Sequence, residues 1–271
     1  MLKYPEIDPV LFTIAGPFQV RWYGLMYVLG FIATYILVRL QIRRVGFHEL
    51  SEHFENLNFV LLLGVVLGGR LGYILFYNLD FYLANPLQML ALTSGGMSFH
   101  GACIALIAAA WWFTRKNKID FWKTADLYAA TIPIGLGLGR IGNFINGELF
   151  GRTTEVPWGM VFPDGGPLAR HPSQLYESFL EGLVLFIILW SVKSKPWRGA
   201  RGWPHGSILA LFLIGYGIFR SMVELVREPD QQIGFLFGSL TMGQLLSTAM
   251  ILAGTSIWVY RLHRTKSEQK R

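Results

Sequence analysis

Long apolar stretches separated by short polar segments constrain this chain more than any other feature. Each is close to the ~18–20 residues that cross the hydrocarbon core of a bilayer. Backbone groups in hydrocarbon must bond to one another, so the stretches are helices or closed barrel strands. Their continuous apolar character disfavours barrel strands, which alternate. We predict about seven helical spans: Trp22–Leu40, Phe59–Leu79, Gly96–Phe113, Leu127–Ile145, Leu175–Val192, Gly206–Val226 and Met242–Tyr260.

Composition separates this chain from soluble proteins. Only 15% of its residues are charged, against roughly 25% in soluble domains, which disfavours an apolar soluble enzyme. No internal repeat interrupts the chain, so we expect one polytopic membrane domain over residues 1–271. The segment before the first span contains Pro5, Pro9 and Pro17 and lacks the apolar core of a cleavable signal. It is expected to be an amphipathic or irregular arm. The predicted fold class is an all-α integral membrane protein.

Lysine and arginine are distributed unevenly between the two sides of the predicted spans. Cytoplasmic loops are enriched in these residues, so the N-terminus is predicted to be periplasmic and the C-terminus cytoplasmic. The net charge of +7 is then a topology signal, and we expect no nucleic-acid partner. The predicted cytoplasmic side holds Arg39, Arg43, Arg44, Arg115, Lys116, Lys118, Lys123, Lys193, Lys195, Arg198, Arg201, Arg261, Arg264, Lys266, Lys270 and Arg271, and the other side Lys3, Arg21, Arg152, Arg170 and Arg227.

The longest segment between spans covers residues 146–174, between spans four and five, and is periplasmic in this topology. It is rich in glycine and proline, which favour turns. We therefore predict an irregular loop or a small periplasmic head.

Arg140 lies near the end of span four. Charged side chains inside a membrane cost at least ~2.5–3.5 kcal/mol and persist when they are paired or functional. Arg140 and Asn143 share a helix face, and together they suit a phosphate diester. The match of Gly137–Gly142 to G-x-G-x-x-G is rejected as a dinucleotide site because it lies within a membrane span. Neighbouring glycines, at 135, 137, 139 and 142, would let a helix or a lipid headgroup approach the backbone.

Span six places Tyr216, Arg220, Glu224 and Arg227 on one helical face. Arg220 and Glu224 are spaced for an i,i+4 ion pair. This pair could be purely structural, or Arg220 could form a second phosphate or glycerol contact that Glu224 holds in place.

Three further groups leave both a structural and a functional interpretation open. His100 lies near the outer end of span three beside glycines, and neutral imidazole is a workable general base. Glu177 and Glu181 lie one turn apart in span five and could serve packing or function. Arg70 lies mid-span without an adjoining substrate motif. No histidines or carboxylates have metal-ligand spacing, so we expect no metal and no cofactor.

Six segments resemble the bacterial phosphatidylglycerol–prolipoprotein diacylglyceryl transferases. The similarity runs from span one to span seven, and the segment ending at Glu148 is its most specific part. One departure is Ala102, where many members have glycine. The segments are Tyr23–Tyr27, Gly68–Tyr73, Gly95–Gly101, Gly139–Glu148, Arg170–Glu177 and Phe219–Glu224.

The resemblance implies a multi-pass enzyme of the bacterial inner (cytoplasmic) membrane, with its active site toward the periplasmic leaflet. It would move the diacylglyceryl group of phosphatidylglycerol, a membrane lipid, to the lipobox cysteine that follows a prolipoprotein signal peptide. The thiol would become a thioether and glycerol phosphate would leave. The implied catalytic residues are His100, Arg140, Arg220 and Glu224; the implied substrate-binding residues are Arg140, Asn143, Tyr23, Glu148, Gly151 and Arg220.

Two other classes of function remain open from the residues alone. A transporter or channel could use the intramembrane charges, although we find no inverted repeat. A scaffold could bind lipoprotein precursors without chemistry.

Overall fold

The computed structural model describes residues 2–15, 18–90, 95–199, 202–228, 235–236 and 240–268. The chain divides into two compact units, Met1–Gln41 with Ala125–Arg271, and Ile42–Thr124. We call these the first and the second unit and describe each by itself. The single domain over 1–271 stays a prediction. Arg201, Lys270 and Arg271, which belong to the predicted basic clusters, lie outside the described residues.

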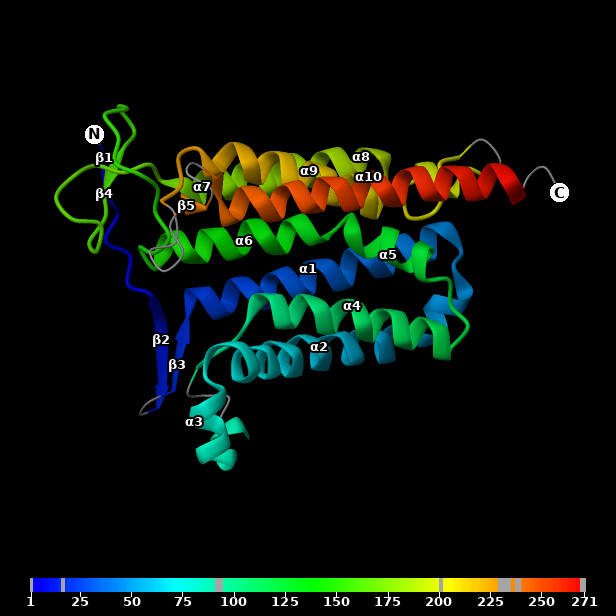
Figure 1. The fold of residues 1–271 in the computed structure, drawn as a ribbon, viewed down its shortest axis with the longest axis horizontal. Helices are drawn as coiled ribbons and strands as arrows, with labels where there is room; N and C mark the ends of the chain where they lie inside the picture. The colour runs from blue at the N-terminus through cyan, green and yellow to red at the C-terminus, as the bar shows by residue number, and fades with distance from the viewer. Residues whose placement is uncertain are drawn as a thin grey trace. The chain divides into compact units, whose positions relative to one another are not determined.

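The second unit is a pair of long helices with a short helical excursion between them (Figure 1). Its long helices are α2 (His48–Tyr77) and α4 (Phe99–Lys116); the excursion contains α3 (Leu79–Ala84) and the 3₁₀ turn η1 (Pro86–Leu90). A Cβ atom built on Gly101 would lie 2.4 Å from the Gly68 carbonyl oxygen. Small residues at this contact let the two backbones approach, as in many membrane helix pairs.

The first unit is built from helices that run side by side (Figure 1). Its buried core contains Ala129, Leu185 and Phe212, each from a different helix. The helices are α1 (Trp22–Val45), α5 (Phe121–Ala129), α6 (Ile132–Ile145), α7 (Ser173–Glu177), the π-helix η3 (Ser178–Val184), α8 (Leu185–Val192), the 3₁₀ turn η4 (Lys195–Trp197), α9 (Ser207–Glu224) and α10 (Met242–Glu268). Residues 42–45 of α1 and 121–124 of α5 belong to the second unit.

Five of the described helical segments are long and apolar enough to cross a membrane: Trp22–Val45, His48–Tyr77, Ser173–Trp197, Ser207–Glu224 and Met242–Ser267. These segments support the predicted multi-pass, mostly helical membrane protein. The count of seven spans and their orientation stay predictions.

Predicted span four is not one continuous helix. α5 ends at Ala129 and α6 begins at Ile132, with Pro133 in its first turn. Proline has no N–H to donate to the preceding turn, so it fits the start of a helix and interrupts a helix interior. The apolar run therefore contains two helices instead of one.

Apolar side chains lie on the surface of these helices in large numbers. Phe59 is 63% exposed and Phe76 is 78% exposed, although both lie in α2. A soluble protein rarely exposes large contiguous apolar patches. These surfaces are suited to lipid.

The N-terminal segment is more regular than its prolines suggest. β2 (Val10–Ala15) and β3 (Phe18–Arg21) form an antiparallel hairpin, and β1 (Leu2–Lys3) pairs in parallel with β4 (Met160–Val161). The prediction of an irregular arm was wrong here, because β-branched and aromatic residues between the prolines favour strands. A further two-residue pair joins β5 (Phe235–Leu236) to β6 (Leu240–Thr241).

Tyr4 fixes this N-terminal segment to the end of α6. Its hydroxyl is 2.6 Å from the Phe144 carbonyl oxygen and 2.9 Å from that of Ile145, the last two carbonyls of the helix, whose ends leave carbonyls without a full set of intrahelical partners. Burial raises the pKa of the Tyr4 hydroxyl, which keeps it a donor. The end of the helix that carries Arg140 is thereby held in place.

Asp126 positions the start of α9. Its buried carboxylate accepts hydrogen bonds from the backbone N–H groups of Gly206, Ile208 and Leu209 at 2.8–3.1 Å. These are N–H groups that a helix start leaves without intrahelical acceptors. A side chain of α5 thus supplies the cap of the helix that carries Arg220.

Candidate functional site

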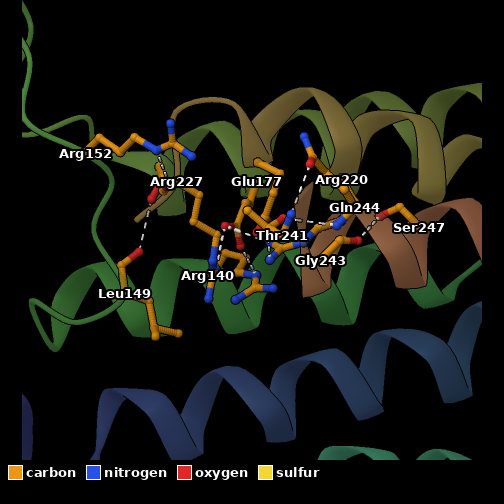
Figure 2. A network of polar contacts seen from close by, with 12 residues as sticks. Arg140, Leu149, Arg152, Glu177, Arg220, Arg227, Thr241, Gly243, Gln244 and Ser247 are labelled. Atoms are coloured by element: carbon orange, nitrogen blue, oxygen red, sulfur yellow. Dashed lines mark hydrogen bonds and ion pairs between the residues drawn. The ribbon is translucent and has the colours of Figure 1, made fainter. Parts of the chain in front are cut away.

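Glu177, at the end of α7, is the centre of a buried ionic network (Figure 2). Its side chain is 1% exposed. One carboxylate oxygen, Oε2, lies 2.5 Å from Arg140 Nε. The other, Oε1, lies 3.1 Å from an Arg220 nitrogen and 2.9 Å from an Arg227 nitrogen. Three arginines from distant parts of the chain therefore share one carboxylate.

Arg220 has a second carboxylate partner on its own helix. Its guanidinium lies 2.8 Å from Glu224 Oε2, so the predicted i,i+4 pair is confirmed. The first turn of α10 approaches the same carboxylate, because a Cβ atom on Gly243 would lie 2.6 Å from Glu224 Cδ. Negative charge is favoured near a helix N-terminus. Glu224 is thus fixed by an arginine and by the start of a helix.

The start of α10 is itself fixed by a reciprocal cap. Gln244 N donates to the Thr241 hydroxyl, and Thr241 N donates to the Gln244 side chain, both at 3.2 Å. This Thr-x-x-Gln arrangement is a capping box. It fixes the first turn of α10, in which Gly243 lies close to Glu224; Figure 2 shows Thr241, Gly243 and Gln244 in this turn.

Arg140 is the most accessible arginine of the network. The exposed fraction of its side chain is 21%, against 13% for Arg220 and 10% for Arg227. A guanidinium binds carboxylate and phosphate oxygens with the same donors. The acceptors of this network are side-chain oxygens, which can move away by bond rotation. An incoming anion could therefore take a place that Glu177 now holds.

The glycines of α6 serve helix packing at three of the four predicted positions. A Cβ atom on Gly137 would lie 3.0 Å from Gly182 Cα, and one on Gly142 would lie 2.9 Å from the Tyr23 ring. A Cβ on Gly30 would lie 3.0 Å from Gly135 Cα. Neighbouring helices therefore occupy part of the α6 face that could also admit a lipid headgroup. Gly135 approaches α1 through its backbone, but a Cβ atom on Gly135 or on Gly139 would meet no atom within 4 Å in the described residues.

Asn143 and Glu148 bind each other. Asn143 Nδ2 donates to Glu148 Oε1 at 2.9 Å, and Asn146 Nδ2 donates to the same oxygen at 3.1 Å. Asn143 is buried, while Glu148 is exposed. The backbone of the loop is held from α7, because Gln174 donates to the Glu148 carbonyl at 2.7 Å.

Gly151 lies where three backbone segments meet. A Cβ atom there would lie 2.5 Å from the Val226 carbonyl oxygen and 2.9 Å from His171 Cβ. Its own N–H donates to the His171 carbonyl at 2.8 Å. The next residue, Arg152, donates through Nε to the Arg227 carbonyl at 2.9 Å (Figure 2). The segment of residues 146–174 is thus fastened to the chain that follows α9, and its description as an irregular loop or a small periplasmic head stays a prediction.

His100 belongs to the second unit. It lies exposed in the first turn of α4, whose N-cap is Ser98, and its ring contacts Phe99. Packing accounts for two of the neighbouring glycines, since Gly101 meets α2 and a Cβ on Gly96 would lie 2.5 Å from the Tyr73 ring. The role of His100 as a base stays a prediction.

Glu177 is not among the residues predicted for the site, because its position in the sequence leaves packing and function equally open. Its i,i+4 spacing to Glu181 shows only that both share a face, whereas its three partners come from other parts of the chain. The signal that could have identified it is a carboxylate inside an apolar span beside several intramembrane arginines. Among the described residues, no group of three or more histidine, cysteine, aspartate or glutamate side chains could hold a metal ion.

Comparison with known proteins places the chain that contains this network in a family. Residues 9–260 match the family model described as prolipoprotein diacylglyceryl transferase. A protein of Desulfotalea psychrophila named phosphatidylglycerol–prolipoprotein diacylglyceryl transferase is 62% identical over 262 residues, which cover 97% of this chain and 96% of that protein. Proteins with the same name from Pseudoalteromonas atlantica and Vibrio cholerae are 50% identical (97% and 92% covered) and 51% identical (96% and 94% covered). The chain therefore belongs to the prolipoprotein diacylglyceryl transferase family.

Proposed function

We propose that this protein transfers the sn-1,2-diacylglyceryl group of phosphatidylglycerol to the lipobox cysteine of prolipoproteins. Family membership over nearly the whole chain supports the reaction. The sulfur of the cysteine bonds to C3 of the diacylglyceryl group, and the bond from C3 to the phosphate oxygen breaks. Glycerol phosphate leaves with the electrons of that bond, and the proton of the thiol is released.

The observation that carries the proposal is the pairing of Arg140 and Arg220 with the carboxylate of Glu177. The donor groups of these arginines are already directed at anionic oxygens in a largely buried site. The lipid phosphate replaces Glu177 on Arg140, while Arg220 keeps the support of Glu224. Charge that develops on the leaving phosphate is stabilised most where water is excluded.

The nucleophile belongs to the substrate. A cysteine thiol has an ordinary pKa near ~8.5, so a base or a positive field must favour its thiolate. His100 is the proposed base, and the arginines supply the field. Tyr23, Asn143, Glu148 and Gly151 shape the lipid-binding surface. Their packing and hydrogen bonds support this role, since Tyr23 lies against Gly142, next to Asn143.

The proposed setting is the bacterial inner membrane, crossed about seven times, with the N-terminus periplasmic and the C-terminus cytoplasmic. The uneven distribution of lysine and arginine supports this orientation. Arg140 lies in the last turns of α6, directly before the head formed by residues 146–174. The reaction would then take place toward the periplasmic leaflet.

The test is reconstitution. Purified protein is incubated with phosphatidylglycerol and a lipobox peptide, and the expected result is a mass gain of one diacylglyceryl group. A peptide with serine in place of the cysteine is the control and should gain nothing. Ion or solute flux without peptide modification would favour a transporter, and peptide binding without modification would favour a scaffold; either result would refute the proposal.

The base is tested separately with His100→Gln. Loss of most transfer at neutral pH, with partial recovery as the pH approaches the thiol pKa, is the expected result. Near-normal transfer at neutral pH would remove His100 from the mechanism and leave the arginine field as the source of thiolate.

A further inference from the structure

Glu181 is a second carboxyl group beside the network, in η3, one turn after Glu177. Its side chain is fully buried. Within the part of the chain that the structure describes, neither of its carboxyl oxygens has a hydrogen-bond partner. Glu177, equally buried, meets three arginines. The two neighbouring carboxyl groups thus differ in their ion pairs, since Glu177 pairs with arginines and Glu181 has no ion pair among the described residues.

Charged groups approach Glu181 from several elements. Glu177 of α7, Arg140 of α6, Arg220 of α9 and Arg227 after α9 all act on it electrostatically. The hydroxyl of Tyr216, also of α9, interacts electrostatically with Glu181 as well. α8 contributes no titratable side chain.

Three arginines and two carboxylates form the network among the described residues. Arg140, Arg220 and Arg227 are permanently charged, since arginine does not lose its proton in proteins. The carboxylates that pair with them are Glu177 and Glu224. Ionised Glu181 would add a further negative charge beside the three arginines.

Two opposing influences therefore act on the proton of Glu181. Burial without hydrogen-bond donors favours the neutral acid, because an unsolvated carboxylate is costly. The positive charges of Arg140, Arg220 and Arg227, which act on Glu181, favour the carboxylate. Where such influences oppose each other, one added charge decides which form is present. The phosphodiester of phosphatidylglycerol brings one negative charge.

We propose that Glu181 takes up one proton when the lipid phosphate enters the arginine network and releases it when glycerol phosphate leaves. This inference rests on the proposed function. The proton from water balances the negative charge of the phosphodiester, so the buried site keeps the same total charge before and after binding. Glu181 is a positioning residue in this scheme, since it acts on the arginines through charge and does not contact the reacting atoms.

The π-helical turn is consistent with this role. A π-helix is rare, forms mostly as one wide turn within an α-helix, and is frequent at functional sites. Here it directs the Glu181 carboxyl to the interior while Gly182 packs against Gly137.

A pH dependence of lipid affinity follows directly. Binding that takes up one proton weakens as the pH rises, by up to about tenfold in Kd per pH unit over the range in which free Glu181 is ionised and bound Glu181 is neutral. The opposite slope would follow if binding released a proton.

The experiment measures phosphatidylglycerol binding to the detergent-purified protein between about pH 6 and about pH 9. The wild type and Glu52→Gln, a change on the exposed surface of α2, should lose affinity in parallel as the pH rises. Glu181→Gln should bind with an affinity that is flatter with pH, and Glu181→Asp should restore the slope. A wild type without a slope, or a slope unchanged by Glu181→Gln, would overturn the inference.

An infrared measurement keeps the test decisive if Glu181→Gln does not fold. Addition of phosphatidylglycerol to the wild type should produce a protonated carboxyl band, and its absence would contradict proton uptake. Transfer to the lipobox peptide is assayed on the same preparation. Active wild-type protein with flat lipid binding refutes only the role of Glu181, whereas failure of transfer refutes the proposed function.

Discussion

Two sites in this protein hold arginines within apolar helices, and they hold them differently. In the second unit, Arg70 is 4% exposed and donates to the backbone carbonyls of Gln88 at 2.7 Å, Met89 at 3.0 Å and Gly96 at 3.3 Å, and also to that of Gly95. Its guanidinium lies 5.1 Å from the centre of the Tyr82 ring. In the first unit, Arg140 and Arg220 meet the side-chain carboxylates of Glu177 and Glu224.

The type of acceptor separates the two roles. Backbone carbonyls around Arg70 cannot leave without unfolding the segment that contains α3 and η1, so this arginine is a structural clamp. Carboxylates can rotate away and be replaced by another anion. A buried arginine with exchangeable acceptors is the better candidate for ligand binding.

Among the substitutions that distinguish the two arginine sites, Glu177→Gln should have the largest effect on stability and transfer. Three guanidinium groups would lose their shared negative charge, and leaving charges buried without a counter-charge costs about 3–5 kcal/mol. We expect a much lower thermal midpoint in detergent and loss of transfer. The exposed Glu52→Gln provides the matched control. An unchanged midpoint would mean that Glu177 is not the centre of the network.

Arg140→Gln should separate chemistry from stability. Loss of one donor to a developing anionic charge typically slows a reaction by about 10²–10³-fold. Glu177 would keep Arg220 and Arg227, so the fold should persist. We expect transfer to collapse with little change in the thermal midpoint, while Arg44→Gln on the exposed surface of α1 leaves both unchanged. Near-normal transfer would disprove phosphate binding by Arg140.

Arg70→Lys should show the reverse pattern. Lysine keeps the charge but not the planar fork of donors, and loss of about two hydrogen bonds costs about 2 kcal/mol. We predict a lower unfolding midpoint and an unchanged transfer rate per folded molecule. A large loss of transfer in folded protein would mean that Arg70 also acts on substrate.

Gly243→Ala is the mildest test. The added methyl group would collide with the Glu224 carboxyl and weaken its contact with Arg220. We expect transfer to fall about tenfold, equivalent to ~1.4 kcal/mol of activation free energy. Gly135→Ala is the control, since the described structure has nothing within 4 Å of a Cβ there. Equal transfer rates for both variants would show that the contact of Glu224 with Arg220 does not affect the reaction.

Local rules predicted part of this site from the sequence. The i,i+4 spacing of Arg220 and Glu224 predicted their ion pair, because neighbours on one helix are fixed by helix geometry alone. The bond between Asn143 and Glu148 depends on the turn at Gly147, whose φ is 70°, and spacing along one helix does not specify such a turn. The contact of Glu177 with Arg140 depends on the packing of α6 against the segment of α7 and η3, so it was not predicted.

The elements of the fold also divide into those that the sequence predicts and those that it does not. The long helices follow from apolar length, whereas the break before Pro133 and the hairpin of β2 and β3 depend on local chemistry that an apolar count overlooks. The Thr241–Gln244 capping box has a sequence signature, and it could have been read in advance.

The wide turn of η3 also sets the rotational phase of everything that follows it in the same segment. Each residue of an α-helix advances the chain by roughly 100°. A wider turn holds more residues for the same rotation, so η3 accommodates a residue that would rotate α8 relative to α7 if the helix stayed regular. Without that accommodation, Leu185 and Leu189, now in the core, would turn away from it while Glu177 kept its place. The wide turn thus makes the ionic network compatible with the packing of α8.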